Sequence, residues 1–415
     1  MRKKIFLSMA LLTVSVGLTA QGEAKSIEEI LKEKGVITVE EYQEAVTQKP
    51  DVAYVPGKGF TAATADGKYK LHIGGYAQLL YKYTDVDSNA ADDKSDFNIR
   101  RFKLQIAGNV VSKDFGYKFQ GDMKNGFTTE DAFINYKFAA PLTVQVGQFK
   151  PAQARQELTS AAKQLFPERS LANDTFNLGR DLGVQAAGSF AGKIVEYRLG
   201  LFNGNGPNTA NPDDRHMVTG RLDLNPLGAY AMDEAGWTSD KPLLNIGGSF
   251  AWNKIGGGDV GSGFSKDNDV MDVALNLDDA ATAAAFTANY GSDLTWLLWT
   301  ANVNAAWMGA TLAGEYYALN ADPSLGSDWD ADGYYVQAGY QVIPQTLELA
   351  ARYSAVESTD TQASAKFDKA ETQFGVNYYF AKHAAKVQAD YTLVSDDWNA
   401  DKDDNIVRLQ AQFYY

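Results

Sequence analysis

Ten basic side chains in this sequence have the types and positions needed to contact a small anion inside a confined passage. Arg100 and Arg101 are adjacent, and most of the others lie either on polar faces of alternating segments or in one long irregular segment. Cationic groups that line a low-dielectric passage act strongly on an anion, whereas exposed charges are screened within about 8 Å at physiological salt. The candidate anion contacts are Arg100, Arg101, Lys103, Lys118, Lys150, Arg155, Lys163, Arg169, Arg198 and Arg221.

Carboxylates accompany these cations and support a second interpretation. Glu157 and Glu168 lie in the same irregular segment, residues 150–180, and Asp122 falls on a polar face nearby. Arg221 with Asp223 is an example of a pair that would only stabilise a wall, as in the ladders of opposite charge common in such structures. The passage is then either anion-selective or only weakly selective, depending on how many cations remain available.

Other chemistry has less support in the sequence. The chain has 415 residues and no cysteine, which removes disulfides, thiolate metal sites and cysteine nucleophiles. The three histidines, His72, His216 and His383, have no recognisable nucleophile or carboxylate partner, so we do not predict an enzyme. A formal net charge of −14 argues against nucleic-acid binding. No cofactor is predicted.

An acidic run near residue 330 has the opening spacing of a calcium loop. Asp328, Asp330 and Asp332 alternate before Gly333, but the twelfth position is Gly339 and not a bidentate Glu, which excludes an EF-hand. These three carboxylates are therefore a weak candidate calcium site, and a solvated acidic hairpin tip is the alternative interpretation.

The elements that position the cations follow from a period of two that begins at Tyr69 and lasts to the end of the chain. Leu71, Ile73 and Leu79 fall on one face while Lys70, His72 and Gln78 fall on the other, and such alternation recurs in segment after segment. We predict sixteen strands at 69–83, 97–111, 115–124, 129–139, 141–150, 179–190, 193–204, 216–226, 243–254, 295–307, 310–320, 332–342, 346–356, 371–381, 384–395 and 404–415.

A soluble sandwich and a membrane barrel both produce this pattern, with opposite faces turned to water. Strands of ten to thirteen residues, aromatic residues near strand ends, alternating short and long connections and a terminal aromatic residue favour the barrel. The fold class is therefore all-β, a sixteen-stranded antiparallel transmembrane β-barrel with a water-filled channel. Residues 255–294 are assigned to a long outer loop, because one more strand would make the count odd.

The adjacent arginines conflict with strict alternation. If Arg101 faces the polar lumen, a regular strand turns Arg100 toward lipid, at a cost of about 2–4 kcal/mol at mid-membrane. Either a β-bulge turns Arg100 inward, or it lies near an interface or a subunit contact.

The N-terminal region has a different organisation. Residues 1–24 read as a signal peptide, with Arg2 to Lys4 before an apolar run. Residues 25–50 read as a helical periplasmic segment, with capping boxes that start at Ser26 and Thr38. Residues 51–68, rich in Pro and Gly, read as a linker, and residues 69–415 form the barrel domain.

A series of motifs in a fixed order resembles the phosphate-selective porin family (porins O and P). They include Asn98-Ile99-Arg100-Arg101-Phe102-Lys103, Val146-Gly147-Gln148-Phe149-Lys150-Pro151, Pro167-Glu168-Arg169-Ser170 and Arg180-Asp181-Leu182-Gly183-Val184. The resemblance implies a trimeric porin whose third long loop folds into the lumen, with an arginine ladder leading to a constriction. Arg100 and Arg101 match the family's paired arginines; which of Lys150, Arg155, Lys163 or Arg169 meets the ion stays open.

These observations together predict an outer-membrane porin of a Gram-negative bacterium, for passive diffusion of small anions such as phosphate or other oxyanions. The expected partners are outer-membrane lipid, two further copies of the chain in a homotrimer, and the permeant anions. A general, weakly selective porin and a non-conducting structural or adhesive barrel are the alternatives.

Overall fold

The structure, a computed structural model, describes residues 27–42, 51–55, 59–87, 93–237, 240–261, 283–358, 368–397 and 403–415. The predicted signal peptide, residues 1–24, and the capping box at Ser26 lie outside the described residues. The chain consists of two compact units, residues 1–50 and residues 51–415. No helix among the described residues is long and apolar enough to cross a bilayer.

The first unit contains α1 (Ile27–Glu33) and a helical turn at residues 39–42. After α1, Gly35 takes a φ of +67°, and the amide of Val36 donates to the carbonyl of Leu31. The turn begins with the capping box predicted at Thr38: the Glu41 amide donates to Thr38 Oγ1 at 3.0 Å, and the Thr38 amide donates to Glu41 Oε2 at 2.7 Å.

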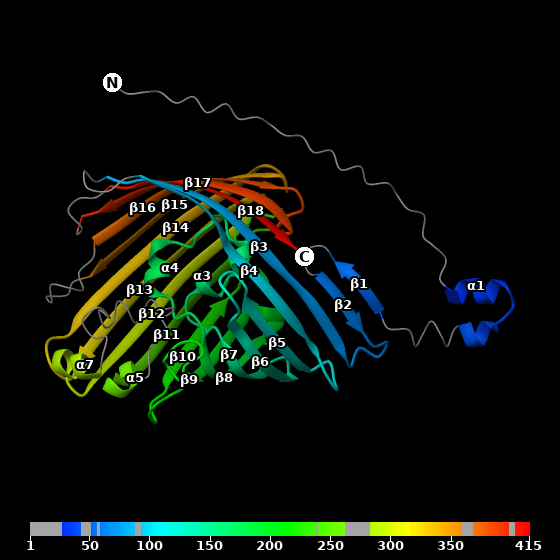
Figure 1. Cartoon of the computed structure of the whole chain (residues 1–415), viewed down its shortest axis with the longest axis horizontal. Helices are drawn as coiled ribbons and strands as arrows, with labels where there is room; N and C mark the ends of the chain where they lie inside the picture. Colours follow the sequence, from blue (N-terminus) through cyan, green and yellow to red (C-terminus); the bar gives the residue numbers. More distant parts are fainter. Residues whose placement is uncertain are drawn as a thin grey trace, which may run out of the picture. The chain divides into compact units, whose positions relative to one another are not determined.

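The second unit contains a closed antiparallel barrel of sixteen strands, β3 to β18, as predicted (Figure 1). Each strand pairs with the next, and β18 pairs with β3, with Arg408 opposite Lys82 and Ala411 opposite Leu79. Every predicted strand is present, and each end differs from its expected position by at most three residues. The strands are β3 (Lys70–Asp85), β4 (Lys94–Asn109), β5 (Phe115–Asp122), β6 (Thr128–Ala139), β7 (Leu142–Phe149), β8 (Asp181–Phe190), β9 (Val195–Phe202), β10 (Met217–Leu224), β11 (Leu243–Gly256), β12 (Asp293–Trp307), β13 (Ala310–Pro323), β14 (Trp329–Ile343), β15 (Leu347–Ser358), β16 (Asp368–Tyr379), β17 (Ala385–Asp396) and β18 (Asn405–Tyr414).

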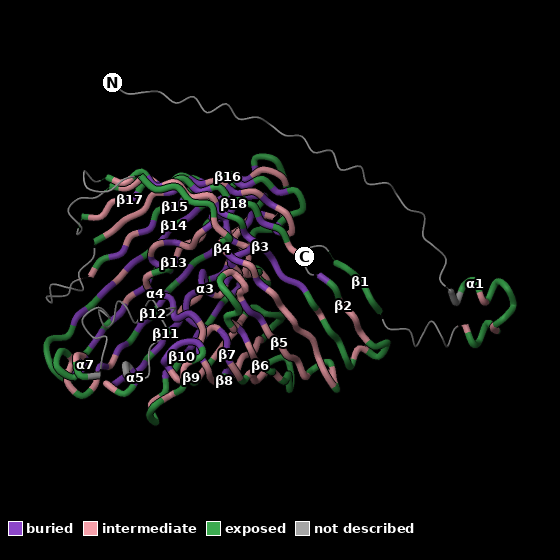
Figure 2. Tube along the Cα trace, viewed as in Figure 1, coloured by how far each residue is buried: buried purple, intermediate pink, exposed green. Residues whose placement is uncertain are grey.

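Burial alternates along most of the strands (Figure 2), and over much of the barrel the buried residues are polar. Gln337 is 2% exposed whereas its neighbour Val336 is 50% exposed, because Gln337 faces the lumen and Val336 faces outward. This reversal of the soluble pattern is typical of a barrel with lipid outside and water within. The outward apolar residues include Leu79, Ile99, Val146, Leu199, Leu222, Val303, Val336, Leu349, Val376 and Leu409.

Residues 51–68 are not the linker that the sequence analysis expected. They include a hairpin of β1 (Asp51–Val55) and β2 (Gly59–Ala63), and β2 pairs with the start of β3, Ala63 opposite Lys70. The physical reason is an open edge: β18 accompanies β3 only from Tyr76 onward, so the backbone groups of Lys70 to Ile73 need another partner.

Residues 255–294, which we assigned to an outer loop, contain no additional barrel strand among their described residues, although β11 and β12 each extend two residues into this range. β11 extends to Gly256 and is followed by α5 (Gly257–Gly261), while α7 (Ala283–Tyr290) precedes β12. The possible strand at 270–277 lies outside the described residues.

One inner connection is much longer than the others. Residues 225–242 join β10 to β11 at the end of the barrel that otherwise has short turns, such as η2 (Ala191–Lys193). The amide of Gly236 donates to Glu348 Oε1 at 2.9 Å, and His383 Nε2 lies 2.8 Å from Asp233 Oδ1. Burial lowers the pKa of His383 to about 4, and Lys386 acts in the same direction. This connection is therefore fixed against the lumen side of β15 and the β16–β17 turn.

Candidate functional site

The loop of residues 150–180, between β7 and β8, is bound across the lumen by polar side chains of distant strands. Gln412 of β18 donates to the Ala162 carbonyl at 3.0 Å, Gln388 of β17 to the Leu165 carbonyl at 3.0 Å, and Arg352 of β15 to the Glu168 carbonyl at 2.9 Å. Because these donors lie on the buried lumen face, the loop occupies part of the channel cross-section. It contains α3 (Arg155–Leu158), η1 (Ala161–Lys163) and α4 (Leu171–Phe176).

An apolar cluster anchors this loop. Phe176 and Leu178 pack with Trp296, Leu298 and Tyr317 on the lumen side of β12 and β13, and Phe176 stacks on Tyr317 at a centroid distance of 5.8 Å. α4 contacts β13, β14 and β15, as Figure 1 shows. The outer half of β12 is apolar on both faces, outward to lipid and inward to the loop. Burial of this kind holds the loop in one position.

The inner connection, residues 225–242, meets the loop from the opposite end of the barrel. Glu234 accepts from the Leu165 amide at 3.0 Å and from Gln156 Nε2 at 3.1 Å, and its own amide donates to the Lys163 carbonyl. Together the two segments fill the side of the lumen next to β13–β17 and leave the passage beside β4–β9.

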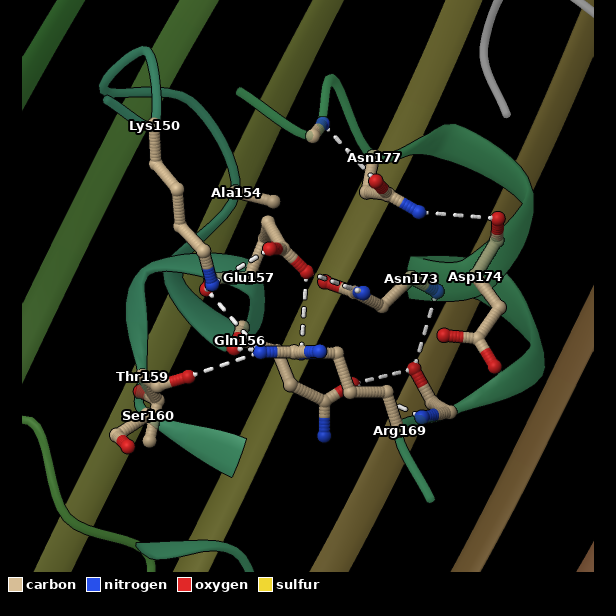
Figure 3. A network of polar contacts seen from close by, with 12 residues as sticks. Lys150, Ala154, Gln156, Glu157, Thr159, Ser160, Arg169, Asn173, Asp174 and Asn177 are labelled. Atoms are coloured by element: carbon tan, nitrogen blue, oxygen red, sulfur yellow. Dashed lines mark hydrogen bonds and ion pairs between the residues drawn. The ribbon is translucent and has the colours of Figure 1, made fainter. Parts of the chain in front are cut away.

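Glu157 is the centre of a polar network on the passage side of the loop (Figure 3). Its carboxylate binds Lys150 Nζ at 2.6 Å and Arg169 Nε at 3.0 Å, and accepts from Asn173 Nδ2 at 3.3 Å. Ser170 caps α4 by accepting from the Asn173 amide at 3.1 Å. Burial acts to raise the pKa of Glu157, but Arg169 and Lys150 outweigh it and lower this pKa to about 2. The carboxylate is therefore ionised and holds both cations in place.

Arg100 and Arg101 both face the lumen, because a β-bulge in β4 places them opposite Gln78 of β3. This confirms the bulge alternative for Arg100. Both guanidinium groups bind Glu168: Arg100 is bidentate, with Nη2 at 2.8 Å, and Arg101 Nη2 lies at 3.2 Å. Burial acts to raise the pKa of Glu168, but Arg101 and Arg100 outweigh it and lower this pKa to about 2.

A second group of ion pairs lines the wall of β4, β5 and β6. Lys103 binds Asp122 at 2.7 Å and also Glu130, and Lys118 binds Asp131 at 2.6 Å. Arg180, at the end of the loop, reaches Glu130 at 3.5 Å and Asp131 at 3.4 Å. The sequence analysis did not include Arg180 among its candidates. Arg180 lies at the junction of loop and strand, where the alternation of polar and apolar residues does not indicate which way a side chain points.

Three adjoining cavities run beside these residues. The outer cavity, about 620 Å³, is lined by Arg100, Arg101, Lys103, Arg169 and Arg180, among others. The middle cavity, about 150 Å³, shares the last four and adds Lys118 and Lys150. The inner cavity, about 220 Å³, shares Lys150 and Asp131 with the middle one and adds Arg198. Six basic and two acidic side chains line the middle cavity: Arg101, Lys103, Lys118, Lys150, Arg169, Arg180, Glu130 and Asp131.

Three predicted anion contacts line none of these three cavities. Arg155 points to the inner connection, donates to the Ala231 carbonyl at 3.0 Å and stacks on Tyr230. Arg221 is buried, with Asp223, Asn302 and the Gln153 carbonyl as its partners. Lys163 lies in η1, on the side of the loop that meets the inner connection. The side chains of Arg155 and Arg221 thus attach the loop to its surroundings, whereas Lys163 contributes its carbonyl, which accepts from the Glu234 amide.

The remaining candidates also have clear positions. Asp328, Asp330 and Asp332 do not converge: the described residues contain no group of three or more His, Cys, Asp or Glu side chains able to hold a metal ion. Asp330 instead accepts from Asn320 of the neighbouring strand at 2.7 Å. Among the histidines, His72 contacts Thr61, and His383 contacts Asp233, a partner that the sequence did not indicate.

Comparisons with known proteins identify the family and agree with the barrel fold. Residues 71–415 match the family described as "Phosphate-selective porin O and P". An uncharacterized protein of Aquifex aeolicus (strain VF5) is 24% identical, with 100% of both chains covered. An anion-selective porin from Comamonas acidovorans has a TM-score of 0.57 at 12% identity, covering 83% of this chain and 99% of the other. OmpF of Salmonella typhi in complex with daunomycin has a TM-score of 0.55 at 14% identity, covering 84% of this chain and 98% of the other. The trimer form of OmpT from Vibrio cholerae has a TM-score of 0.52 at 14% identity, covering 83% of this chain and 99% of the other.

Proposed function

Because the chain belongs to the phosphate-selective porin O and P family, and is thus an outer-membrane channel of a Gram-negative bacterium, we propose that it conducts small anions by passive diffusion. Phosphate and other oxyanions are the proposed permeants. The family name, the anion-selective neighbour and the charges of the lumen support this choice.

The observation that carries the proposal is the composition of the middle cavity, where six basic side chains face two acidic ones. The chain as a whole has a formal charge of −14, so this excess is local. In a passage of about 150 Å³ a permeating ion passes close to these groups, and the low-dielectric wall strengthens their field. Much of the charge is compensated: Glu130 and Asp131 together bind Lys103, Lys118 and Arg180. Glu157 binds Lys150 and Arg169, and Glu168 binds Arg101. A moderate anion preference follows, rather than a strong one.

The reversal potential of single channels in a potassium chloride gradient tests this proposal. We expect anion preference in the wild type and a larger loss of it in Arg101→Glu than in Arg408→Glu. Arg101 lines the outer and middle cavities, whereas Arg408 of β18 pairs with Asp390 of β17 and lines none of the three. Cation preference in the wild type would overturn the proposal, and equal effects of the two variants would remove Arg101 from the selective region.

We also propose that the chain forms a homotrimer, with the wall of short strands as the subunit contact. β5, β7, β9 and β10 have 8 residues each. At about 3.3 Å per residue and a tilt of about 40°, such strands rise only about 20 Å, less than the apolar band of about 25 Å. A neighbouring subunit would cover this low wall, and the trimeric OmpT neighbour is consistent with it.

A further inference from the structure

Arg198 differs from the other arginines that line the passage because it makes no hydrogen bond or ion pair with any described residue. It lies on β9, and its Nη1 atom is buried without a partner. Arg100, Arg101, Arg169 and Arg180, by contrast, each bind a carboxylate. A half-buried guanidinium group with no counter-charge in contact still has N–H donors available to bind an acceptor.

The strand neighbour of Arg198 does not supply that counter-charge. Arg221 of β10 is its direct cross-strand partner, and two like charges in that position repel each other. Asp223 is already committed to Arg221, with contacts of 2.7 Å to both Nε and Nη2. Glu196 and Asp223 act on Arg198 only from beyond ion-pair distance, so Arg198 has no counter-charge in direct contact, and it lines the inner cavity.

The inner cavity provides both room and further donors. Its volume of about 220 Å³ is several times the share of one water molecule, about 30 Å³, so a tetrahedral oxyanion fits with part of its hydration. Gln145 and Gln185 face each other across β7 and β8 and also line it, and neither side-chain amide makes a hydrogen bond among the described residues. Lys150 lines it as well, although Glu157 holds its ammonium group.

We propose that Arg198, with Gln145 and Gln185, forms a second anion-binding site on the inner side of the constriction, for a small oxyanion such as inorganic phosphate or sulfate. The planar guanidinium group binds two oxygens of such an ion at once, and the amides donate to the others. The cavity shares Lys150 and Asp131 with the middle cavity, so the site lies in series with the constriction. An ion leaving the constriction is received by Arg198 before it reaches the inner end.

This inference rests on the proposed anion channel, and its test separates the two. Chloride current through single channels is measured while inorganic phosphate is added to either side, in the wild type, Arg198→Gln, Arg198→Lys and Arg408→Gln. We expect phosphate to block the wild type and Arg408→Gln equally. Arg198→Gln should weaken the block about tenfold, mainly for phosphate added on the inner side, where the proposed site lies. Arg198→Lys keeps the positive charge but loses the planar guanidinium group, so its phosphate block is expected to be intermediate between those of the wild type and Arg198→Gln.

A structural readout does not depend on conduction. Crystals of the wild type soaked in selenate are expected to show an anomalous peak within hydrogen-bond distance of Arg198, and those of Arg198→Gln to lack it. An anion-selective wild type whose Arg198→Gln variant keeps both the block and the peak would overturn the inner site while leaving the proposed function intact. A cation-selective wild type would overturn the proposed function, and the presence or absence of the peak would still decide the site.

Discussion

Neutralising Glu168 is expected to increase anion selectivity, because this carboxylate occupies the guanidinium groups of Arg100 and Arg101. Glu168→Gln removes one negative charge, which is fully present at neutral pH since the pKa of Glu168 is about 2. A permeant anion held by the same two arginines would lie about 5 Å from the removed charge. Coulomb repulsion at that distance is about 0.8 kcal/mol in water and about 3 kcal/mol at an effective dielectric constant of 20.

The lower value applies best to a water-filled lumen, so we expect the ratio of anion to cation permeability to rise about fourfold or more. The assay is the reversal potential of reconstituted channels in a tenfold potassium chloride gradient, repeated at high and low total salt because screening reduces the effect. The amide side chain that Glu168→Gln introduces still accepts one hydrogen bond from Arg100 or Arg101, which keeps part of the attachment of the loop.

The matched control is Glu357→Gln, which makes the same chemical change at an exposed position near the outer end of β15. It should leave the reversal potential within error of the wild type. An unchanged or lower permeability ratio in Glu168→Gln, with normal assembly and unitary conductance, would refute the reasoning that Glu168 competes with the permeant ion.

Three further predictions concern the loop, the inner connection and the subunit contact. Phe176→Ala removes a fully buried ring from the loop anchor and should weaken docking of the loop by about 3–5 kcal/mol, measured as faster proteolysis of the loop and noisier channel current. Between pH 6.5 and pH 4, His383 is protonated in the unfolded chain but stays neutral in the folded protein. The free energy of unfolding should therefore fall as the pH drops, by about 2 kcal/mol at pH 5. Thermal unfolding of the wild type and His383→Gln at pH 7 and pH 5 measures this difference. A fluorophore on Leu199→Cys should be quenched less by brominated lipid than one on Leu349→Cys, because the subunit contact covers the short wall.

Each of these predictions has a distinct control or contradictory result. Phe97→Ala, at an outward position that is 83% exposed, should leave the proteolysis rate of the loop unchanged. Equal acid sensitivity of the wild type and His383→Gln would show that burial does not lower the pKa of His383. Equal quenching at positions 199 and 349 would show that β9 and β15 both face lipid, which contradicts a subunit contact at the short strands. Labelling is specific because the native chain has no cysteine.

The strands were predictable from the sequence because one physical constraint, lipid outside and water inside, acts on every second residue. The same regularity exposed the conflict at Arg100, which the bulge opposite Gln78 resolves. The hairpin at residues 51–63 was not predicted, since its strands are short and the edge that they cover exists only once β18 has paired with β3.

The ion pairs of the passage were not predictable in the same way. Glu168 lies 68 residues from Arg100, and nothing in their local sequence indicates that the loop reaches the wall of β4. Arg155 and Arg169 lie in the same loop and have the same chemistry, yet one faces the inner connection and the other faces the passage. The difference depends on which side of the loop packs on the cluster around Phe176, and that cluster belongs to strands far along the chain.

The attachment of the constriction loop also has a consequence for the order in which the protein is assembled. Its carbonyls bind Lys386, Gln388 and Gln412, which lie 222 to 250 residues away, on the last two strands to be synthesised. Contacts of such high sequence separation form late and slowly. The narrow passage therefore cannot precede closure of β18 on β3, and any chain released before closure would hold a loop with no wall to bind.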